Sequence, residues 1–208
     1  MKEEKKMQQI IFATQNPDKM REIRAIFADL GMEVLSMKEA GILLEVEEKG
    51  RTFEENARIK AAAVAECCQG IVLADDSGLE IDYLNQEPGV YSARYLGEDT
   101  AYEVKNRILL ERLASVENEL RTARFVCAIA AAFPDGRIET VRETMEGRIG
   151  DEAKGNHGFG YDPIFFLPEY GCSSAELSLE QKNAISHRGK ALRKMRQVLA
   201  AWLADEQG

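Results

Sequence analysis

A hairpin signal in the middle of the sequence restricts the fold of this chain more than any other feature. The tripeptide Pro134-Asp135-Gly136 separates two strand-like segments, Arg124–Phe133 and Arg137–Arg148. Proline, aspartate and glycine in this arrangement are typical of a tight turn. Two strands joined by a tight turn run antiparallel. A mixed sheet is therefore favoured over a fully parallel one.

The first half of the chain, in contrast, alternates short apolar strands with helices. The predicted elements are a strand at Gln9–Ala13, a helix from Asn16-Pro17 to Gly31, a strand near Glu33–Ser36, a helix from the capping box of Thr52 and Glu55 to about Cys68, and a strand at Ile71–Ala74. A turn with the sequence DDSG, a strand around Leu79–Tyr83, a helix from the capping box of Thr100 and Glu103 to about Leu113, and a last helix after Ser186 complete the prediction. This order predicts an α/β fold with a mixed twisted sheet and flanking helices.

Length and composition indicate one globular core. With 208 residues, of which 45% are hydrophobic, the chain is long enough for a single α/β domain over residues 9–208, in two lobes. The first eight residues, 1–8, are predicted to be a disordered extension. The N-terminal apolar run is too short for a signal peptide or a membrane span, so we expect no membrane partner.

The formal net charge of −9 argues against binding to a nucleic-acid polymer, because the phosphates would be repelled. A small polyphosphate can still bind when a divalent cation and a few local cations offset the repulsion. Four cysteines without a C-x-x-C pair and only two histidines leave too few ligands for a zinc site. The same cysteine usage fits a reducing compartment.

The first candidate site is the segment from Thr14 to Lys19, where a strand leads directly into a helix. Free backbone N–H groups and the positive end of a helix meet at such a junction, which favours anions. Thr14 and Asn16 add hydrogen-bond donors, and Lys19 adds a cation in the first turn. The segment is no Walker A loop, because it lacks the required glycines. A simple helix cap is the equal alternative from this segment alone.

The second candidate is Ala74-Asp75-Asp76-Ser77-Gly78, predicted to lie at the end of a buried strand. Two adjacent carboxylates repel each other, so burying them requires a compensating cation. Side chains alternate along a strand, which places one carboxylate in the site and the other against a structural partner. Mg²⁺ prefers such hard oxygen ligands. The alternative is a polar turn with an Asx hydrogen bond.

Two further segments carry less specific signals. The acidic run Glu45–Glu48 is typical of a solvated surface, and Lys60 is either a surface lysine or a ligand of phosphates. The glycine-rich segment Gly155–Pro163 offers Phe159 or Tyr161 to cover a planar base, although an aromatic residue here can equally belong to the core. His187-Arg188 at a helix start is unusual, because cations are disfavoured there, and it suggests an anion or a base carbonyl as partner.

Taken together, these segments resemble the inosine-triphosphate pyrophosphatase family, which comprises dITP/XTP pyrophosphatases. The resemblance covers nearly the whole chain from about Ile10. It is carried by ATQNPDK, TFEENA, LADDSGL, PGVYSARY, GFGYDPIF and AISHRG in this order. It implies a mixed α/β fold with two lobes around a central active-site cleft, a homodimer, a cytoplasmic location and Mg²⁺-dependent cleavage of ITP, dITP and XTP to the monophosphate and pyrophosphate.

The resemblance also implies a role for individual residues. Asp76 would be the catalytic base and a Mg²⁺ ligand, and Glu48 the second ligand, with Glu47 as the alternative. The nucleotide would be bound by Thr14, Gln15, Asn16, Pro17, Asp18, Lys19, Lys60, Ser77, Phe159, Gly160, Tyr161, Asp162, Lys182, His187 and Arg188. The chain departs from the family pattern in its N-terminal extension and in His157, and neither touches the matching motifs. The rivals are a pyrophosphatase for modified pyrimidine nucleotides and a nucleotide-sensing module without turnover.

Overall fold

The computed structural model describes residues 9–14 and 17–205. Seven strands form one sheet in the order β2-β1-β3-β4-β5-β6-β7. β1 runs parallel to both β2 and β3, whereas β5, β6 and β7 pair antiparallel. The predicted mixed sheet is therefore confirmed. The strands are β1 Gln9–Phe12, β2 Glu33–Ser36, β3 Ile71–Ile81, β4 Thr122–Ala132, β5 Ile138–Ile149, β6 Phe165–Leu167 and β7 Cys172–Ser173.

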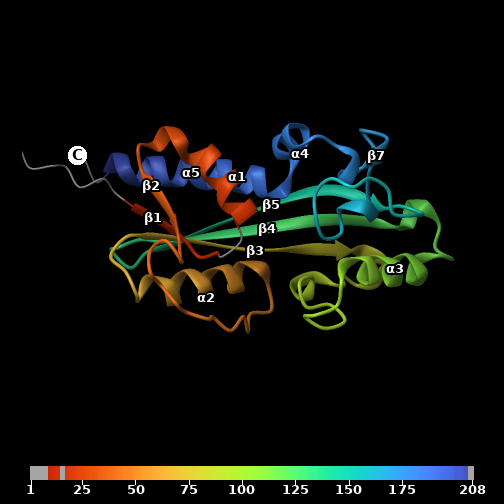
Figure 1. Ribbon diagram of the computed structural model, residues 1–208, viewed down its shortest axis with the longest axis horizontal. Helices are drawn as coiled ribbons and strands as arrows, with labels where there is room; N and C mark the ends of the chain where they lie inside the picture. The colour runs from red at the N-terminus through yellow and green to blue at the C-terminus, as the bar shows by residue number, and fades with distance from the viewer. Residues whose placement is uncertain (1–8, 15–16, 206–208) are drawn as a thin grey trace, which may run out of the picture. The chain divides into compact units, whose positions relative to one another are not determined.

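Five α-helices flank the strands (Figure 1). They are α1 Pro17–Phe27, α2 Phe53–Ala65, α3 Tyr102–Leu113, α4 Leu179–Ile185 and α5 His187–Asp205. Short 3₁₀ helices lie at Ala28–Leu30, Asp82–Leu84, Gly89–Tyr91, Asn118–Leu120, Asp162–Ile164 and Ser174–Glu176. Among the residues that the structure describes, no helix is both long enough and apolar enough to cross a membrane.

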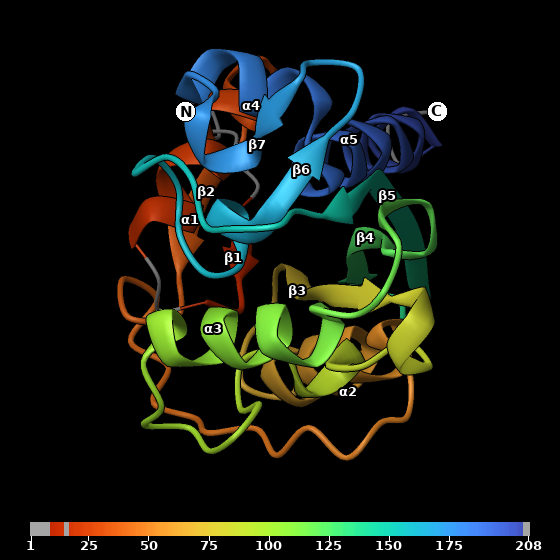
Figure 2. The ribbon, with the colours of Figure 1, turned by 90° about the vertical axis from the view of Figure 1, so that its right-hand side faces the viewer.

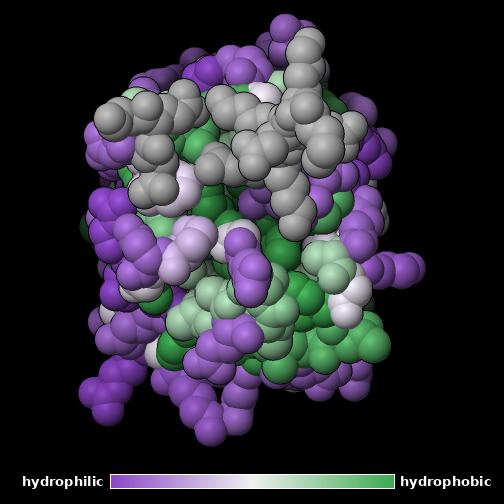
Figure 3. All heavy atoms as spheres, turned by 90° about the vertical axis from the view of Figure 1, so that its left-hand side faces the viewer, coloured by the Kyte–Doolittle hydropathy of each residue, from purple (hydrophilic) through white to green (hydrophobic). Residues whose placement is uncertain are grey.

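The chain divides into two compact units. Unit 1 takes in the segment up to Asp76, then Ala128–Arg142, and the segment from Ala191 onward. Within it, α1 and α5 cover one face of the strands and α2 covers the other (Figure 1). The helices present apolar stripes to the sheet, since Ile23, Phe27, Leu192, Met195 and Leu199 are all buried. One surface of this unit shows hydrophilic side chains around an apolar area (Figure 3).

Unit 2 comprises Ser77–Cys127 and Glu143–Lys190. It contains β3 from Ser77 on, β4 as far as Cys127, β5 from Glu143 on, and β6 and β7. α3 and α4 lie on opposite sides of these strands (Figure 2). The core of unit 2 is aliphatic and aromatic, because the buried face of α3 meets the inward side chains of the strands. Its members include Leu79, Ile81, Leu109, Leu113, Phe125, Met145, Ile149, Ile164 and Phe165.

The predicted hairpin is confirmed. β4 and β5 are neighbours in the sheet, and the turn between them is closed by two hydrogen bonds. Phe133 N donates to Arg137 O at 2.9 Å, and Gly136 N donates to Phe133 O at 3.0 Å. Gly136 has a φ of +89°, which glycine adopts without steric cost.

The prediction of a turn at DDSG is wrong. Ile71–Ile81 is one uninterrupted strand that passes through Asp75, Asp76, Ser77 and Gly78. Aspartate, serine and glycine favour turns when their polar groups have no other partners. Here both carboxylates have partners from other elements, and the buried Leu79 and Ile81 continue the strand into a second part of the core.

Helix caps were predicted with mixed success. The Thr52 hydroxyl accepts from Glu55 N at 3.1 Å and caps α2 as expected, although Glu55 itself accepts from Arg51 N, and the helix ends at Ala65 rather than Cys68. The capping box at Thr100 is wrong. Ala101 is the N-cap of α3, and the Thr100 hydroxyl donates to Leu96 O at 2.7 Å instead.

Candidate active site

The two adjacent carboxylates of β3 point to opposite faces of the strand, as the alternation of strand side chains predicts. Asp75 accepts two hydrogen bonds from Lys19 Nζ of α1, at 2.8 and 3.1 Å. Asp76 accepts one from Asn56 Nδ2 of α2, at 3.0 Å. Since α1 and α2 cover opposite faces, each carboxylate has its own set of partners (Figure 1).

Lys19 is placed by the first turn of α1, and its ammonium group is partly exposed, whereas Asp75 is fully buried. The ion pair compensates the buried Asp75 charge and holds the lysine at the helix N-terminus. Thr14 is the second residue after β1, and its N–H donates to Phe12 O at 2.7 Å. The predictions for Gln15 and Asn16, and for the side chains of Pro17 and Asp18, lie outside the described residues.

Asp76 lies in a polar cluster formed by Glu48, Asn56 and Lys60. Lys60 Nζ is 3.1 Å from Glu48 Oε1 and also donates to the main-chain carbonyl of Asp75. Lys60 and Asn56 are one helical turn apart on α2, so both face the same part of β3. The sequence left open whether Lys60 is a surface lysine, and the structure shows that it is not.

Asn56 is a member of this cluster that sequence analysis missed. Its side chain is fully buried, and its Oδ1 accepts from Gly50 N at 2.8 Å while its Nδ2 donates to Asp76. A Cβ at Gly50 would lie 2.6 Å from Asn56 Oδ1, which explains why glycine is required there. Asn56 belongs to the motif TFEENA, and a polar residue between apolar positions of a helix was the available signal.

Burial dominates the electrostatics of Asp76. It raises the pKa of this carboxyl group from 3.8 to about 6, against the opposing effects of Lys60 and Asn56. The carboxylates of Glu48 and Asp75 raise this pKa further. Burial alone would lower the pKa of Lys60, but the charges of Asp75, Asp76 and Glu48 outweigh it, so the pKa of Lys60 is raised. Asp76 can therefore gain or lose a proton near neutral pH, and the charged ammonium group of Lys60 lies beside it.

The structure separates Glu48 from Glu47. Glu47 is 76% exposed and pairs with Lys49 at 2.9 Å, whereas Glu48 is 25% exposed and acts on the pKa of Asp76. Within the described part of the chain, no group of three or more histidine, cysteine, aspartate or glutamate side chains could hold a metal ion. Two carboxylates are sufficient for Mg²⁺, because this ion keeps waters and takes substrate phosphates as its other ligands. Glu48 and Asp76 fit that requirement.

A second group of predicted residues lies in unit 2 around Asp162. This buried carboxylate accepts from Phe159 N at 2.8 Å and from the Ser174 hydroxyl at 3.0 Å, and it forms an ion pair with Lys182. A Cβ at Gly158 would lie 2.3 Å from Asp162 Oδ2, and Gly158 has a φ of +79°, so glycine is required for this turn. Asp162 thus fixes both the turn and the lysine.

Phe159 is the exposed aromatic residue of the turn, at 55% exposure. Lys182 Nζ lies 5.2 Å and Arg188 Cζ 5.7 Å from its ring centroid. Two cations therefore lie beside one exposed aromatic ring. Ser77 is partly buried on β3. His187 starts α5 as predicted, and its ring stacks on Phe125 at 5.0 Å.

Tyr161 belongs to the core, which is one of the two alternatives that the sequence allowed. It is 3% exposed, its hydroxyl donates to Ser92 O at 2.7 Å, and its ring meets Tyr102 edge-on at 5.2 Å. Of the two aromatic residues that the sequence offered for covering a base, Tyr161 is thus turned inward. Phe159 alone remains for that role.

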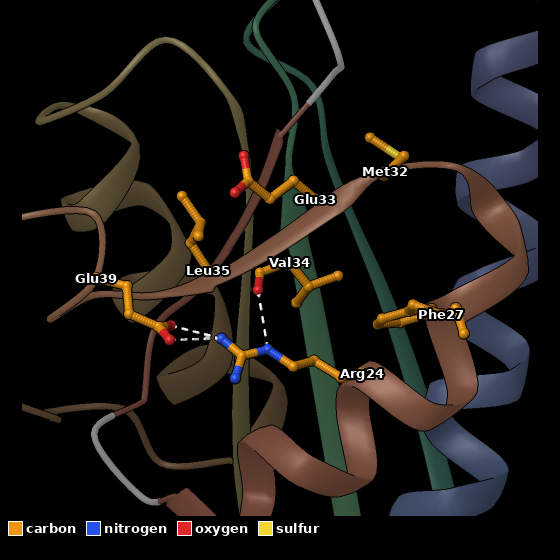
Figure 4. Close-up of a pocket in the computed structure, with 8 residues that line it drawn as sticks. Arg24, Phe27, Met32, Glu33, Val34, Leu35 and Glu39 are labelled. Carbon is orange, nitrogen blue, oxygen red and sulfur yellow. Dashed lines mark hydrogen bonds and ion pairs between the residues drawn. The ribbon is translucent and has the colours of Figure 1, made fainter.

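A cavity of about 410 Å³ lies elsewhere in unit 1, between α1 and β2 (Figure 4). Arg24 reaches across it to Glu39, with N–O distances of 2.6 and 2.8 Å, and also donates to Val34 O. Hydrogen bonds from Arg24 and Ser36 lower the pKa of Glu39 to about 2. Arg24 and Glu39 thus satisfy each other, and Asp76 is not among the lining residues of the cavity.

Comparison with known proteins finds relatives that are similar to this chain over nearly its whole length. The sequence pattern of the Ham1 family matches residues 10–198. A protein of Exiguobacterium sibiricum named dITP/XTP pyrophosphatase is 49% identical over 196 residues, which cover 94% of this chain and 99% of the relative. A Bacillus subtilis protein of the same name is 47% identical over 195 residues, with 94% and 98% covered.

Solved structures agree with the sequence comparison. The Ham1 protein of Staphylococcus aureus superposes with a TM-score of 0.86 at 41% identity, covering 93% of this chain and 99% of the other. A HAM1 protein from Coxiella burnetii gives 0.87 at 39% identity, covering 94% and 100%.

Proposed function

This chain belongs to the Ham1 family, and from this premise we propose that it hydrolyses non-standard purine nucleoside triphosphates such as dITP, ITP and XTP to the monophosphate and pyrophosphate. Two of its relatives with 47–49% identity carry the name dITP/XTP pyrophosphatase. The observation that carries the proposal is the buried Asp76 carboxylate beside Glu48 and Lys60. A buried acid with a pKa of about 6 and an adjacent lysine supplies both a base and a phosphate ligand.

The metal of the proposed reaction is Mg²⁺, held by Glu48 and Asp76. Both residues offer carboxylate oxygens, which this ion prefers, and the small number of protein ligands leaves room for substrate phosphates. When bound, Mg²⁺ neutralises phosphate oxygens and stabilises the charge that moves to the leaving pyrophosphate.

Asp76 orients and deprotonates the attacking water. Its pKa of about 6 leaves it mostly ionised at neutral pH, and yet basic enough to accept a proton. Asn56 holds one carboxylate oxygen in place, so the base has a fixed direction. Lys60 and Lys19 contribute positive charge for the triphosphate, as the resemblance implies for both. Ion pairs with Glu48 and Asp75 keep the two ammonium groups in position before substrate arrives.

Phe159, Lys182, His187 and Arg188 would recognise the base. The exposed Phe159 ring offers a flat apolar face for stacking, and the two cations beside it are hydrogen-bond donors. A 6-oxo purine accepts hydrogen bonds from such donors. The 6-amino group of adenine would face them with another donor, at a cost of about 1–3 kcal/mol for each lost bond. Hypoxanthine and xanthine, which carry the 6-oxo group, are therefore preferred to adenine.

A nucleotide panel tests the proposal. dITP, XTP, ATP, dGTP and dUTP are each incubated with the protein and Mg²⁺, and phosphate and pyrophosphate are measured separately. We expect pyrophosphate from dITP and XTP well above all others. Preferred release from dUTP would instead indicate a pyrimidine enzyme, and binding of dITP without any pyrophosphate would indicate a sensing module.

The family resemblance further leads us to expect a cytoplasmic homodimer. Sedimentation equilibrium at several protein concentrations measures the mass directly, and a monomer at every concentration would contradict the expectation. The charge of −9 supports a small-molecule substrate rather than a nucleic-acid polymer.

A further inference from the structure

The turn that carries Phe159 is held from the side by α3. Figure 2 shows the segment before β6 lying against the N-terminal half of this helix. Asn106 Nδ2 donates to the main-chain carbonyl of Gly160 at 3.1 Å. The Tyr102 ring covers the α-carbon of Gly160, since a Cβ there would lie 3.6 Å from Tyr102 Cε1. Both contacts fall on the residue directly after Phe159.

A second layer of contacts holds Tyr102 itself. Lys105 Nζ lies 4.8 Å from the Tyr102 ring centroid and donates to Ala93 O at 2.6 Å. The Lys105 side chain is 1% exposed, and burial lowers the pKa of its ammonium group. On the other side, the Tyr102 ring meets Tyr161 edge-on. The aromatic pair and the lysine therefore leave Tyr102 one position against the turn.

Asparagine is energetically unfavourable at the buried position 106 of α3. It is 6% exposed, and among the described residues its Oδ1 has no hydrogen-bond partner. A buried carbonyl oxygen without a partner costs stability, and a leucine would be the better helix residue here. The amide can therefore be explained by the hydrogen bond that its Nδ2 donates to Gly160 O.

Gly160 has a φ of +69°, in the region that favours glycine, and its carbonyl belongs to the turn that carries Phe159. Asn106 holds that carbonyl from a helix, which is more rigid than a loop. We infer that Asn106, supported by Tyr102 and Lys105, is a positioning residue that sets the direction of the Phe159 ring and thereby the selectivity for the base. This inference rests on the proposed function, in which Phe159 stacks on the purine.

The test compares Asn106→Ala with Arg107→Ala. Arg107 is the neighbouring residue of α3, its side chain is 67% exposed and its Nε lies 3.8 Å from Glu111 Oε1, so its removal controls for changes in the helix. We expect Asn106→Ala to lower kcat/KM for dITP about 3- to 10-fold through KM, with kcat and the rate with ATP nearly unchanged. Arg107→Ala should match the wild type.

A double-mutant cycle with Phe159→Ala separates positioning from a merely structural role. If Asn106 acts through the Phe159 ring, Asn106→Ala should change the dITP/ATP ratio less than twofold once Phe159 is alanine. The inference would be overturned if Asn106→Ala changed the dITP/ATP ratio equally with and without Phe159, or if it lowered kcat/KM equally for dITP and ATP. Asn106→Leu serves the same comparison if Asn106→Ala does not fold, because it keeps the branched shape of the side chain and has a higher helix propensity.

The outcomes also separate this inference from the function that it assumes. A wild-type protein that releases no pyrophosphate from dITP refutes the proposed function. A wild-type protein that prefers dITP, together with an unchanged dITP/ATP ratio in Asn106→Ala, refutes only the role of Asn106.

Discussion

Asp76→Asn should stabilise the metal-free protein at neutral pH, although it removes the proposed catalytic base. The carboxyl group is 8% exposed and its pKa is raised from 3.8 to about 6, chiefly by burial. The folded protein is therefore a poorer environment for the ionised form than water is. Asparagine cannot ionise, and its side-chain oxygen can still accept the hydrogen bond from Asn56.

The sign and size follow from proton binding. Between about pH 4 and pH 6 the folded state holds a proton on Asp76 that the unfolded chain has lost, so stability falls as the pH rises through this window. Above it, the full difference between 3.8 and about 6 is expressed, which corresponds to about 3 kcal/mol. Asp76→Asn does not lose this stability, because asparagine does not ionise.

Urea denaturation in the presence of EDTA measures the effect. We expect the free energy of unfolding of Asp76→Asn to exceed that of the wild type by less than about 1 kcal/mol near pH 4 and by about 3 kcal/mol near pH 8. Added Mg²⁺ should reduce the difference in unfolding free energy between the two proteins at pH 8, because it binds the folded wild type more tightly than the folded variant.

Asp82→Asn is a control with the opposite sign. Hydrogen bonds from Arg124 lower the pKa of Asp82, so its ionised form stabilises the folded protein. This variant should lose stability at neutral pH, and the loss should shrink as the pH falls through the lowered pKa. The reasoning about Asp76 fails if Asp76→Asn is less stable than the wild type at pH 8, or if the difference does not change with pH.

Three further predictions concern turnover. Asp76→Asn should lower kcat at saturating Mg²⁺ by about 10²- to 10⁴-fold, the usual contribution of a general base, and near-wild-type turnover would contradict its assignment. Lys19→Ala should lower kcat/KM strongly but equally for dITP and dGTP, because its ammonium group belongs to the phosphate-binding residues; an altered dITP/dGTP ratio would argue against that role. Arg188→Ala should lower kcat/KM for ITP about 10- to 100-fold more than for ATP, and an equal fall for both substrates would move Arg188 to the phosphates or the scaffold.

The sequence by itself determined the features that depend on neighbouring residues. The hairpin at Pro134-Asp135-Gly136 follows from local backbone preferences, and so does the N-cap at Thr52. The start of α5 at His187 was predicted for the same reason. The opposite orientations of Asp75 and Asp76 also followed from the sequence, because side chains alternate along a strand and the two residues are adjacent.

Only the tertiary structure decided the features that depend on partners far along the chain. DDSG has the composition of a turn, yet it continues a strand because Lys19 and Asn56, 56 and 20 residues away, satisfy its carboxylates. Tyr161 turns inward because the carbonyl of Ser92, 69 residues away, accepts a hydrogen bond from its hydroxyl. Local strand propensities span about 1 kcal/mol between the best and the worst residue, whereas a buried polar group without a partner costs about 1–3 kcal/mol. Where the two compete, the distant partner determines the structure.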